Sequence, residues 1–583
     1  MPQEATNGAR RQRGGSTDGL APLAELFIRV APPPRARKVA AMPAPFLHRT
    51  FVLACLLGLG VATATGRETN IETGIRDQVL HMGGGVEPAT LDPHLNTGSP
   101  ESAIISVLFE ALVTRSRDGR TIEPAAARAW DIADGGRTYT FHLRDDLRWS
   151  NGEPLTARDF HQSFLRALTP QLAGEPGVMM YPVIGAEAFK KGEATDPASV
   201  GFEAPDDHTL VVRLREPMPH FLQLITSYPW LPVHRASVEA AGGWTTPAAR
   251  WTRPGTMIGN GPFVLKSWTP NSVLTVVRNP HYHDAARVRL HEIRYYPIES
   301  TATEERAFRA GQLHVTYEVP ESKIDAYQRD RPEVLRIAPR LGVNFLFFNV
   351  TAAPFTDVRV RRAFAFAIDR DRLVTTILKG GKTAASSYIQ PGMGGFEPQA
   401  RFGHDPERAR TLLAEAGFPG GRGFPRVEYL YNTLERNRDV AEALQAMWRR
   451  QLGIEVTLKN EEWKVFVDTR QNGNFQVARA GWNPYADEPT DFFQMLVAGS
   501  TYNDARWTHE EYTRLYREAS TDLDRSNRHA RYHRMEEIIA EEMPLVPLFF
   551  NSQVRLVDTS VQNWTHNLFD DRPIEDLWLA GQN

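Results

Sequence analysis

NRDVAEALQAMWRRQLGIEVTLKN (Asn437–Asn460) joins a helix to a strand through a single glycine. The pattern predicts a helix that ends at Gly453, because glycine readily takes the left-handed conformation that closes a helix. The residues after Gly453 predict a strand. The same order, helix then strand, recurs in other parts of the chain. Such alternation indicates an α/β protein in which helices are layered on sheets.

The neighbouring stretches extend this pattern in both directions. VARAGWNPYADEPTDFF predicts a strand over Val477–Trp482, a loop over Asn483–Asp487 and the start of a helix over Glu488–Phe493. TDVRVRRAFAFAIDRDRLVTTILKGG (Thr356–Gly381) predicts one helix, capped at Thr356 or Asp357 and ended by two glycines. Further elements are expected as a strand over 138–143, a helix over 157–168, a hairpin over 263–277, a helix over 526–542 and a strand over 546–554.

Bulk properties limit the possible functions. A chain of 583 residues exceeds the size of a single core and predicts two or three domains. The net charge of −3 argues against a nucleic-acid partner. Cys55 is the sole cysteine and lies in the N-terminal apolar segment, so disulfides and thiol chemistry are excluded in the folded body.

The N-terminus carries an export signal. Residues 1–41 are rich in arginine, proline and glycine, and predict a disordered extension or a start assigned too early. Residues 42–64 have the layout of a signal peptide: basic residues, a short apolar run and a small-x-small cleavage pattern. Lipidation at Cys55 is disfavoured, because most of the apolar run follows the cysteine. We therefore expect a soluble, exported protein that starts near Thr65.

Motifs for catalysis and metal binding are incomplete. KGGKT (Lys379–Thr383) lacks the first glycine of a phosphate loop, and a helix end is the better interpretation. HARYH (His529–His533) lacks the glutamate of a zinc-protease helix. HYH (His281–His283) has no evident third metal ligand. These patterns predict no cofactor, no metal and no enzyme, and leave a secreted hydrolase as a disfavoured alternative.

A series of short motifs resembles the extracytoplasmic solute-binding proteins of oligopeptide ABC transporters. They cover nearly all of the exported chain and follow the family's order, which makes them specific together although each is weak alone. They lie at Glu87–Ile105, Trp149–Phe160, Gly259–Trp268, Asn279–His283, Phe348–Val374, Leu412–Phe418, Glu461–Trp482 and Asp487–Phe493.

The resemblance implies a two-lobed periplasmic-binding-protein fold of type II-like α/β character, with an extra inserted domain and a cleft that closes about a hinge. A peptide would lie in the cleft as an extended strand, held through its backbone. The implied segments are lobe I over 65–109, the inserted domain over 110–234, lobe I again over 235–336, lobe II over 337–552 and lobe I over 553–583.

The resemblance also implies ligand contacts. Trp463 and Trp482 would pack on ligand side chains, and Arg470 and Arg479 would receive the terminal carboxylate, for which a guanidinium is suited. Without the resemblance, an ion pair between Arg479 and a neighbouring acid would be favoured. The loop of Thr97, Gly98 and Ser99 would bond the peptide backbone, and the loop with Asn483, Tyr485 and Asp487 would read the amino end.

Several positions depart from the family pattern. Tyr485 stands where well-known members have the aspartate that pairs with the ligand ammonium, and Asp487 is the expected substitute. Thr97 replaces a glutamate, Asn437 a histidine and Ala365 a lysine. A modified peptide, such as a cell-wall peptide, or a non-peptide solute therefore remains an alternative ligand.

The partners implied are peptides of about two to five residues and the membrane permease of an ABC importer, with no nucleic acid. The protein is expected to act in the periplasm as a monomer.

Overall fold

The computed structural model describes residues 68–247, 250–571 and 573–581. The predicted extension over 1–41, the predicted signal peptide over 42–64 and Cys55 lie outside these ranges. Among the described residues, no helix combines the length and the apolar character that crossing a membrane requires.

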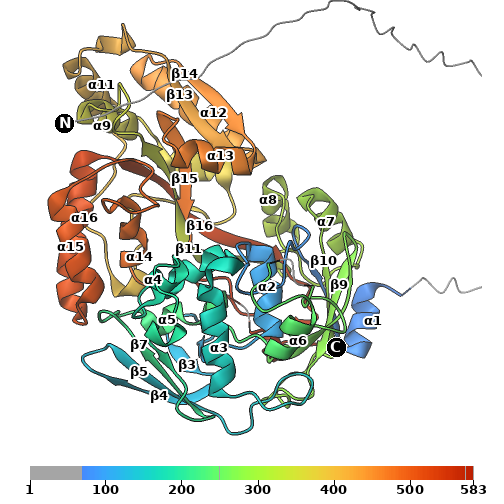
Figure 1. The fold of residues 1–583 in the computed structure, drawn as a ribbon. Helices are drawn as coiled ribbons and strands as arrows, with labels where there is room; N and C mark the ends of the chain where they lie inside the picture. The colour runs from blue at the N-terminus through green and yellow to red at the C-terminus, as the bar shows by residue number, and fades with distance from the viewer. Residues whose placement is uncertain (1–67, 248–249, 572, 582–583) are drawn as a thin grey trace, which may run out of the picture. The chain divides into compact units, whose positions relative to one another are not determined.

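A four-stranded sheet forms the base of what we call lobe I (Figure 1). Strand β1 pairs in parallel with β10, whereas β10, β9 and β8 pair antiparallel. The β8–β9 pair confirms the predicted hairpin. The strands are β1 (Val79–Gly83), β10 (Glu292–Tyr296), β9 (Val273–Arg278) and β8 (Phe263–Thr269). Lobe I also holds α1 (Asn70–Asp77), α2 (Ser99–Leu108), α6 (Arg235–Ala240), α7 (Thr301–Arg309), α8 (Glu321–Asp330), β17 (Val561–Gln562) and β18 (Trp578–Leu579).

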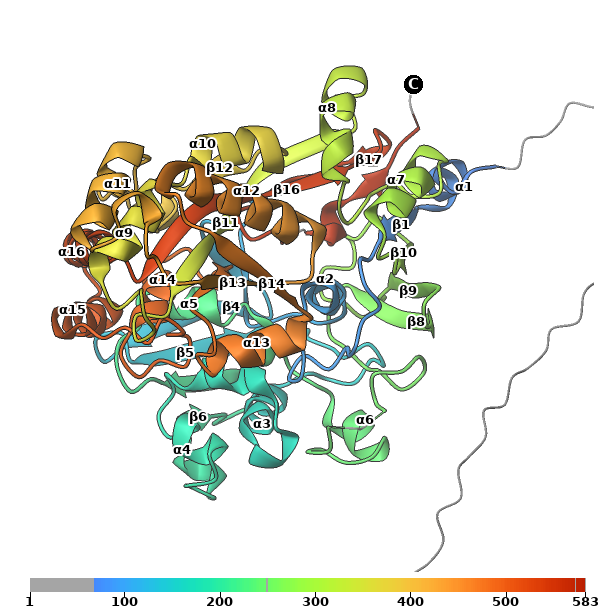
Figure 2. The same cartoon turned by 90° about the horizontal axis from the view of Figure 1, so that it is seen from above.

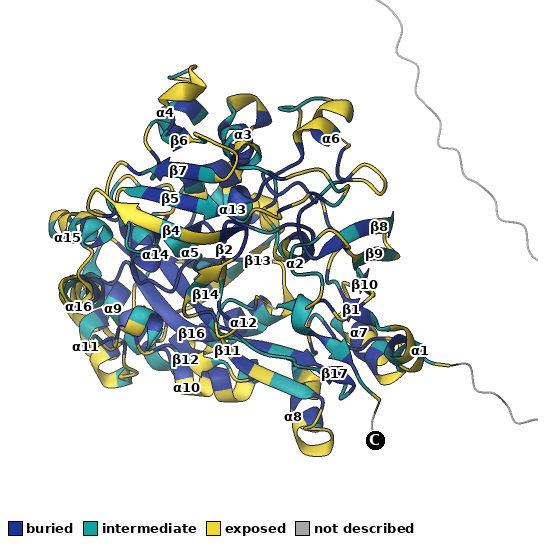
Figure 3. Ribbon diagram, turned by 90° about the horizontal axis from the view of Figure 1, so that it is seen from below, coloured by how far each residue is buried: buried dark blue, intermediate teal, exposed yellow. Residues whose placement is uncertain are grey.

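A second four-stranded sheet, in the order β4-β5-β7-β6, forms what we call the inserted domain. Helix α3 begins where the side chains of Thr156 and Asp159 cap each other's backbone N–H groups, as the sequence predicts for its start. Strand β4 is an edge strand, exposed along most of its length (Figure 3). The elements are β2 (Val113–Arg115), β3 (Ile122–Pro124), β4 (Ala127–Ala133), β5 (Thr138–Leu143), α3 (Ala157–Leu168), α4 (Ala186–Lys190), β6 (Phe202–Glu203), β7 (Thr209–Arg213) and α5 (Phe221–Leu224).

A six-stranded sheet, in the order β12-β16-β11-β15-β13-β14, forms lobe II. Helix α12 lies between β13 and β14 in the chain and lets these two strands pair in parallel. The strands are β11 (Leu335–Phe348), β12 (Thr383–Ala384), β13 (Val427–Asn432), β14 (Val456–Glu461), β15 (Val477–Trp482) and β16 (Leu545–Leu556). The helices are α9 (Val358–Phe366), α10 (Arg370–Arg372), α11 (Pro406–Glu415), α12 (Glu435–Leu452), α13 (Trp463–Gln471), α14 (Thr490–Phe493), α15 (Glu510–Thr521) and α16 (Arg525–Glu542).

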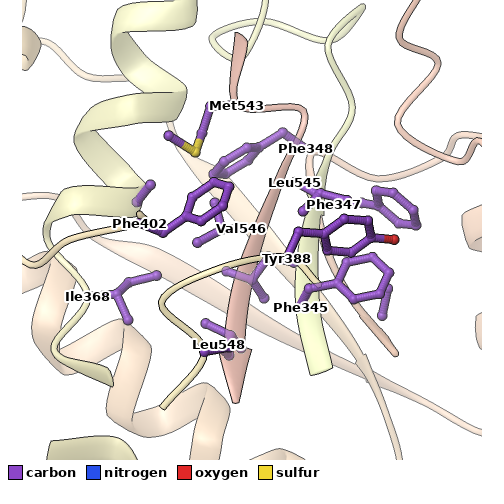
Figure 4. Packing of buried hydrophobic residues seen from close by; sticks show 14 of the residues in the cluster. Phe345, Phe347, Phe348, Ile368, Tyr388, Phe402, Met543, Leu545, Val546 and Leu548 are labelled. Carbon is purple, nitrogen blue, oxygen red and sulfur yellow. The ribbon is translucent and has the colours of Figure 1, made fainter. Parts of the chain in front are cut away.

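The core of lobe II lies where β11 and β16 meet the helices (Figure 4). Phe345 packs edge-on against Phe347 at 4.9 Å and against Tyr388 at 5.7 Å between ring centroids. All three side chains are fully buried. Burial of such aromatic rings contributes strongly to stability, so these residues anchor the centre of the lobe II sheet.

Strands β11 and β16 connect the two lobes (Figure 2). They pair antiparallel from Leu335–Leu556 at one end to Phe347–Leu545 at the other, with a register shift after Pro339. Leu556 belongs to a small core with residues of α7 and α8, and Val557 to the core of lobe I. Long strands shared by two lobes form a hinge about which the lobes can close.

A buried ion pair joins lobe I to the inserted domain. Arg166 of α3 donates to both carboxylate oxygens of Asp92, at 3.0 and 2.6 Å. Trp251 Nε1 donates to Asp92 Oδ2 at 3.1 Å, and His94 Nδ1 lies 2.8 Å from Arg166. The Arg166 side chain is 0% exposed and that of Asp92 is 5% exposed. Removing either partner would leave the other as an unpaired buried charge, so both are needed for stability.

The prediction of one continuous helix within Thr356–Gly381 is wrong. The stretch after Asp357 forms α9, then breaks, and continues as α10 and a π-helical turn over Leu373–Leu378. The break occurs because the Asp369 side chain accepts the Arg372 N–H and caps a new helix. Lys379 ends the turn, in agreement with the interpretation of KGGKT as a helix end.

Candidate ligand-binding site

Strand β15 places Arg479 on one face of the lobe II sheet. Alternate residues of a strand share a face, so Arg479 and Gly481 lie on the same side. The register sets Asn344 of β11 opposite Gly481. A Cβ atom at Gly481 would lie 3.2 Å from both Arg479 Nη2 and Asn344 Oδ1. Glycine at 481 therefore leaves the space that the guanidinium occupies.

Arg479 has amide partners but no acidic partner. Its Nη2 donates to Asn344 Oδ1 at 2.8 Å, and its Nη1 lies 3.4 Å from Asn432 Oδ1. Its Nε and the nearby Tyr429 hydroxyl are buried without a hydrogen-bond partner. No carboxylate of the described residues forms an ion pair with Arg479. Burial lowers the pKa of Arg479 to about 10, so the group stays charged at neutral pH.

Arg470 differs from Arg479 because its charge is already balanced. Its Nε lies 2.7 Å from Asp504 Oδ2, and both side chains are largely buried. The guanidinium also lies over the Phe466 ring at 5.3 Å and approaches the Arg479 carbonyl oxygen at 3.5 Å. Arg470 therefore supports the strand that carries Arg479, and Arg479 is the cation left open to an anion.

A chain of asparagine amides runs along the same face of the sheet. Asn344 donates to Asn551 Oδ1 at 2.7 Å, and Asn551 donates to Asn483 Oδ1 at 2.9 Å. On the other side of Arg479, Asn437 donates to Asn432 Oδ1 at 2.9 Å. Asn437 is buried and joins the site through Asn432. Because amides both donate and accept, these side chains can orient Arg479 and bond a polar ligand.

Aromatic side chains lie at the end of β15. The Trp482 ring packs edge-on against Tyr485 at 6.1 Å and against Tyr502 at 5.1 Å. Burial raises the pKa of Tyr485 well above its ordinary value, so this phenol stays neutral. Trp463, at the start of α13, is 54% exposed and stacks on Phe466. Exposed and half-buried aromatic surface of this kind suits contact with ligand side chains.

The loop after β15 touches the inserted domain. Arg115 Nη2 donates to the Tyr485 carbonyl oxygen at 2.6 Å, and the Asp487 N–H donates to Gln223 Oε1 at 2.6 Å. Asp487 Oδ1 accepts the Gly394 N–H at 2.8 Å, while no hydrogen bond to its Oδ2 occurs among the described residues. Burial raises the pKa of the Asp487 carboxyl.

The predicted loop of Thr97, Gly98 and Ser99 forms the start of α2. Asn96 shapes it, because its Oδ1 accepts the Gly98 N–H at 2.9 Å and its Nδ2 donates to Ser102 at 2.8 Å. Thr97 and Ser99 are exposed. In the part of the chain that the structure describes, no hydrogen bond, ion pair or ring contact joins these three residues to β15.

The family model described as bacterial extracellular solute-binding proteins, family 5 Middle, matches residues 121–504 of this sequence. This range is well over half of the chain. The protein belongs to that family. The family 5 assignment agrees with the recognised motifs, and it is a family of solute-binding proteins.

The similarity to individual relatives extends over most of this chain. The probable deoxycholate-binding periplasmic protein YgiS of Escherichia coli is 34% identical over 86% of this chain and 94% of its own length. The periplasmic oligopeptide-binding protein OppA of Salmonella typhimurium is 34% identical over 91% of this chain and 96% of its own. The solved murein tripeptide binding protein MppA of Escherichia coli has a TM-score of 0.75 at 33% identity, over 86% of this chain and 99% of its own.

The likeness to MppA and the three larger sheets confirm the predicted fold class of two α/β lobes with an inserted domain. The exact segment limits stay predictions. Arg470 approaches the Arg479 carbonyl oxygen, and Trp482 lies on the same strand as Arg479. The roles of these motif residues in ligand binding stay predictions. Ala365, the position of a family lysine, is buried in the lobe II core and offers no charge to a ligand.

Sequence reasoning missed the amides that hold Arg479 and the acid that holds the loop. Asn344 and Asn551 lie on strands far from β15 in sequence, and nothing local marks them. Asp491 falls within the predicted helix start over Glu488–Phe493, and no local pattern predicts its hydrogen bonds. In the structure its carboxylate accepts hydrogen bonds from the loop before that helix.

Proposed function

We propose that this protein captures short peptides in the periplasm, as a monomer, and delivers them to the membrane permease of an ABC importer. The observation that carries the proposal is Arg479, a charged guanidinium without an acidic partner among the described residues. A largely desolvated cation is costly unless an anion pairs with it. A peptide brings such an anion as its terminal carboxylate. The names of the relatives OppA and MppA point to peptides as well.

Each end of the peptide would contact a different residue. The carboxylate would pair with Arg479, with the amide of Asn344 beside it. The amino group would approach Asp487, whose Oδ2 is free of hydrogen bonds in the described structure. Trp463 and Trp482 would cover ligand side chains, and the Thr97–Ser99 loop would bond the peptide backbone. Backbone contacts supply affinity that does not depend on sequence.

Identification of the natural ligand tests the proposal. The exported protein is purified without denaturation and weighed by native mass spectrometry, and its ligands are released by acid and weighed. We expect a mixture of peptides of about two to five residues, because main-chain recognition is tolerant of side chains. A single non-peptide species in full occupancy would refute the peptide proposal and leave a different solute as the cargo.

Asp487→Asn tests the amino end. The variant keeps an oxygen for the Gly394 N–H but loses the negative charge. We expect affinity for an Ala-Xaa-Ala tripeptide pool to fall about tenfold or more, because hydrogen bonds between charged groups contribute roughly 1.5–3 kcal/mol. Affinity for the N-acetylated pool should be unchanged. Both are measured by native mass spectrometry titration.

Asp371→Asn is the matched control, since Asp371 is an exposed acid on α10. It should bind both pools like the wild type. Equal affinity of wild type and Asp487→Asn for the free tripeptides would remove Asp487 from the site.

A further inference from the structure

Asp491 is a buried carboxylate whose two oxygens are saturated. Oδ1 accepts Trp482 Nε1 at 3.2 Å and Gln494 Nε2 at 2.6 Å. Oδ2 accepts the backbone N–H groups of Tyr485 at 2.5 Å and Ala486 at 3.3 Å. Three of these donors belong to Trp482–Ala486, the end of β15 and the loop that follows. Asp491 therefore ties this loop to the start of α14.

No cation balances Asp491 within the described parts of the chain. The titratable groups that face it are phenols: Tyr485 on its own loop, Tyr388, Tyr502, and Tyr516 of α15. Burial, and to a lesser degree the Asp491 charge, raises the pKa of these phenols, so they are neutral. The neighbouring acid Glu488 is different, because Arg528 pairs with it at 3.2 Å.

The saturation of both oxygens decides what Asp491 can do. A carboxylate oxygen has room for about two strong donors, so neither oxygen can also receive a ligand. The loop it holds carries Trp482, Tyr485 and Asp487, and Arg115 binds the same loop from the inserted domain. An effect of Asp491 on the ligand must therefore pass through the position of the loop.

We propose that Asp491 is a positioning residue: its ionised carboxylate holds Trp482–Asp487 in the ligand-binding conformation, so that peptide binding weakens on acidification. This inference rests on the proposed function. A carboxylate is suited to the task because it accepts hydrogen bonds in four directions and donates none. An amide in its place would point an NH₂ group at two of the four donors.

The expected pH dependence has a definite sign. Burial raises the pKa of Asp491 to about 6, against the hydrogen bonds, which favour the charged form. Above pH 6 the group is ionised and the loop is held. Below pH 6 the proton occupies one oxygen and displaces its N–H donors. If only the ionised form binds, affinity at pH 5 is about tenfold lower than at pH 7.5.

A spectroscopic test reads Asp491 directly through Trp482. The protein is labelled with ¹⁵N-tryptophan, and the indole N–H resonance of Trp482, assigned with Trp482→Phe, is followed from pH 8 to pH 4.5. We expect it to shift with a midpoint near pH 6 in the wild type and in Asp487→Asn, and not in Asp491→Asn. The Asp487→Asn variant lacks the second titrating carboxyl of this loop, so a shift that persists in it is not caused by Asp487. A Trp482 resonance that does not titrate in the wild type would overturn the inference. Because this outcome is read in the wild type, it does not depend on whether a variant folds.

A binding test links the loop to the ligand. The Ala-Xaa-Ala pool is titrated into wild type and Asp491→Asn at pH 7.5 and pH 5. We expect the variant to bind about tenfold or more weakly at pH 7.5 and to lose the wild-type pH dependence. Wild-type affinity and an unchanged pH profile in the variant would refute the role of Asp491. A wild type that binds no peptide of the pool would instead refute the proposed function.

Discussion

Replacing Arg479 with methionine is expected to weaken the binding of free tripeptides by about 100-fold or more. Removing one partner of a desolvated, hydrogen-bonded charge pair costs roughly 2–5 kcal/mol. Methionine keeps the length and apolar stem of the side chain but no charge, so the ligand carboxylate would be buried alone. The measurement is a titration of the Ala-Xaa-Ala pool, followed by the same pool with C-terminal amides, for which wild type and variant should bind alike.

Arg470→Met is the matched control, because this arginine already has an acidic partner. It leaves Asp504 buried without its cation, so it should lower the free energy of unfolding. Arg479→Met removes an unpaired cation and should leave stability equal or higher. If Arg479→Met binds free peptides as tightly as the wild type does, Arg479 is not the carboxylate receptor.

Asp92→Ala is expected to destabilise the protein by about 3–5 kcal/mol, because it leaves Arg166 buried with its charge unbalanced. The Arg166 side chain is 0% exposed, so water cannot replace the lost partner. Urea unfolding measures the free-energy change. Hydrogen exchange should show the largest loss of protection in α3 and in the segment around Asp92, which the pair joins.

The double variant Asp92→Ala/Arg166→Met should recover part of this loss, because it removes both charges. Asp330→Ala serves as a control, since its pair with Arg329 is exposed and contributes little. Equal stability of Asp92→Ala and wild type would mean that the buried pair does not hold the inserted domain to lobe I.

Local signals in the sequence predict many of the elements correctly. Strand β15 over Val477–Trp482, the start of α3 at Thr156 and the end of α12 at Gly453 match the structure because caps, glycines and alternation act over a few residues. The break at Asp369 was missed although its capping signal is present. No glycine or proline lies between α9 and α10 to mark the break, and the predicted helix was ended only at the later glycines.

The chemistry of the site depends on contacts between distant parts of the chain, which no local pattern encodes. Asn344 and Asn551 reach Arg479 through the pairing of β11 with β15 and with β16. An ion pair between Arg479 and a nearby acid, which would be favoured without the resemblance, is not found among the described residues for a similar reason. The nearby acids have other partners: Glu488 pairs with Arg528, and Asp491 accepts four N–H groups.

Strand β16 comes late in the chain, so the lobe II sheet cannot be completed early in synthesis. Leu346 of β11 pairs with Val546 of β16, about 200 residues further along the chain. Until β16 has been made, one side of β11 has no strand beside it and the rings of Phe345 and Phe347 lack part of their cover. Lobe II therefore completes its sheet only near the end of synthesis. A chain that still lacks β16 stays open at this sheet and needs protection from aggregation until that segment arrives.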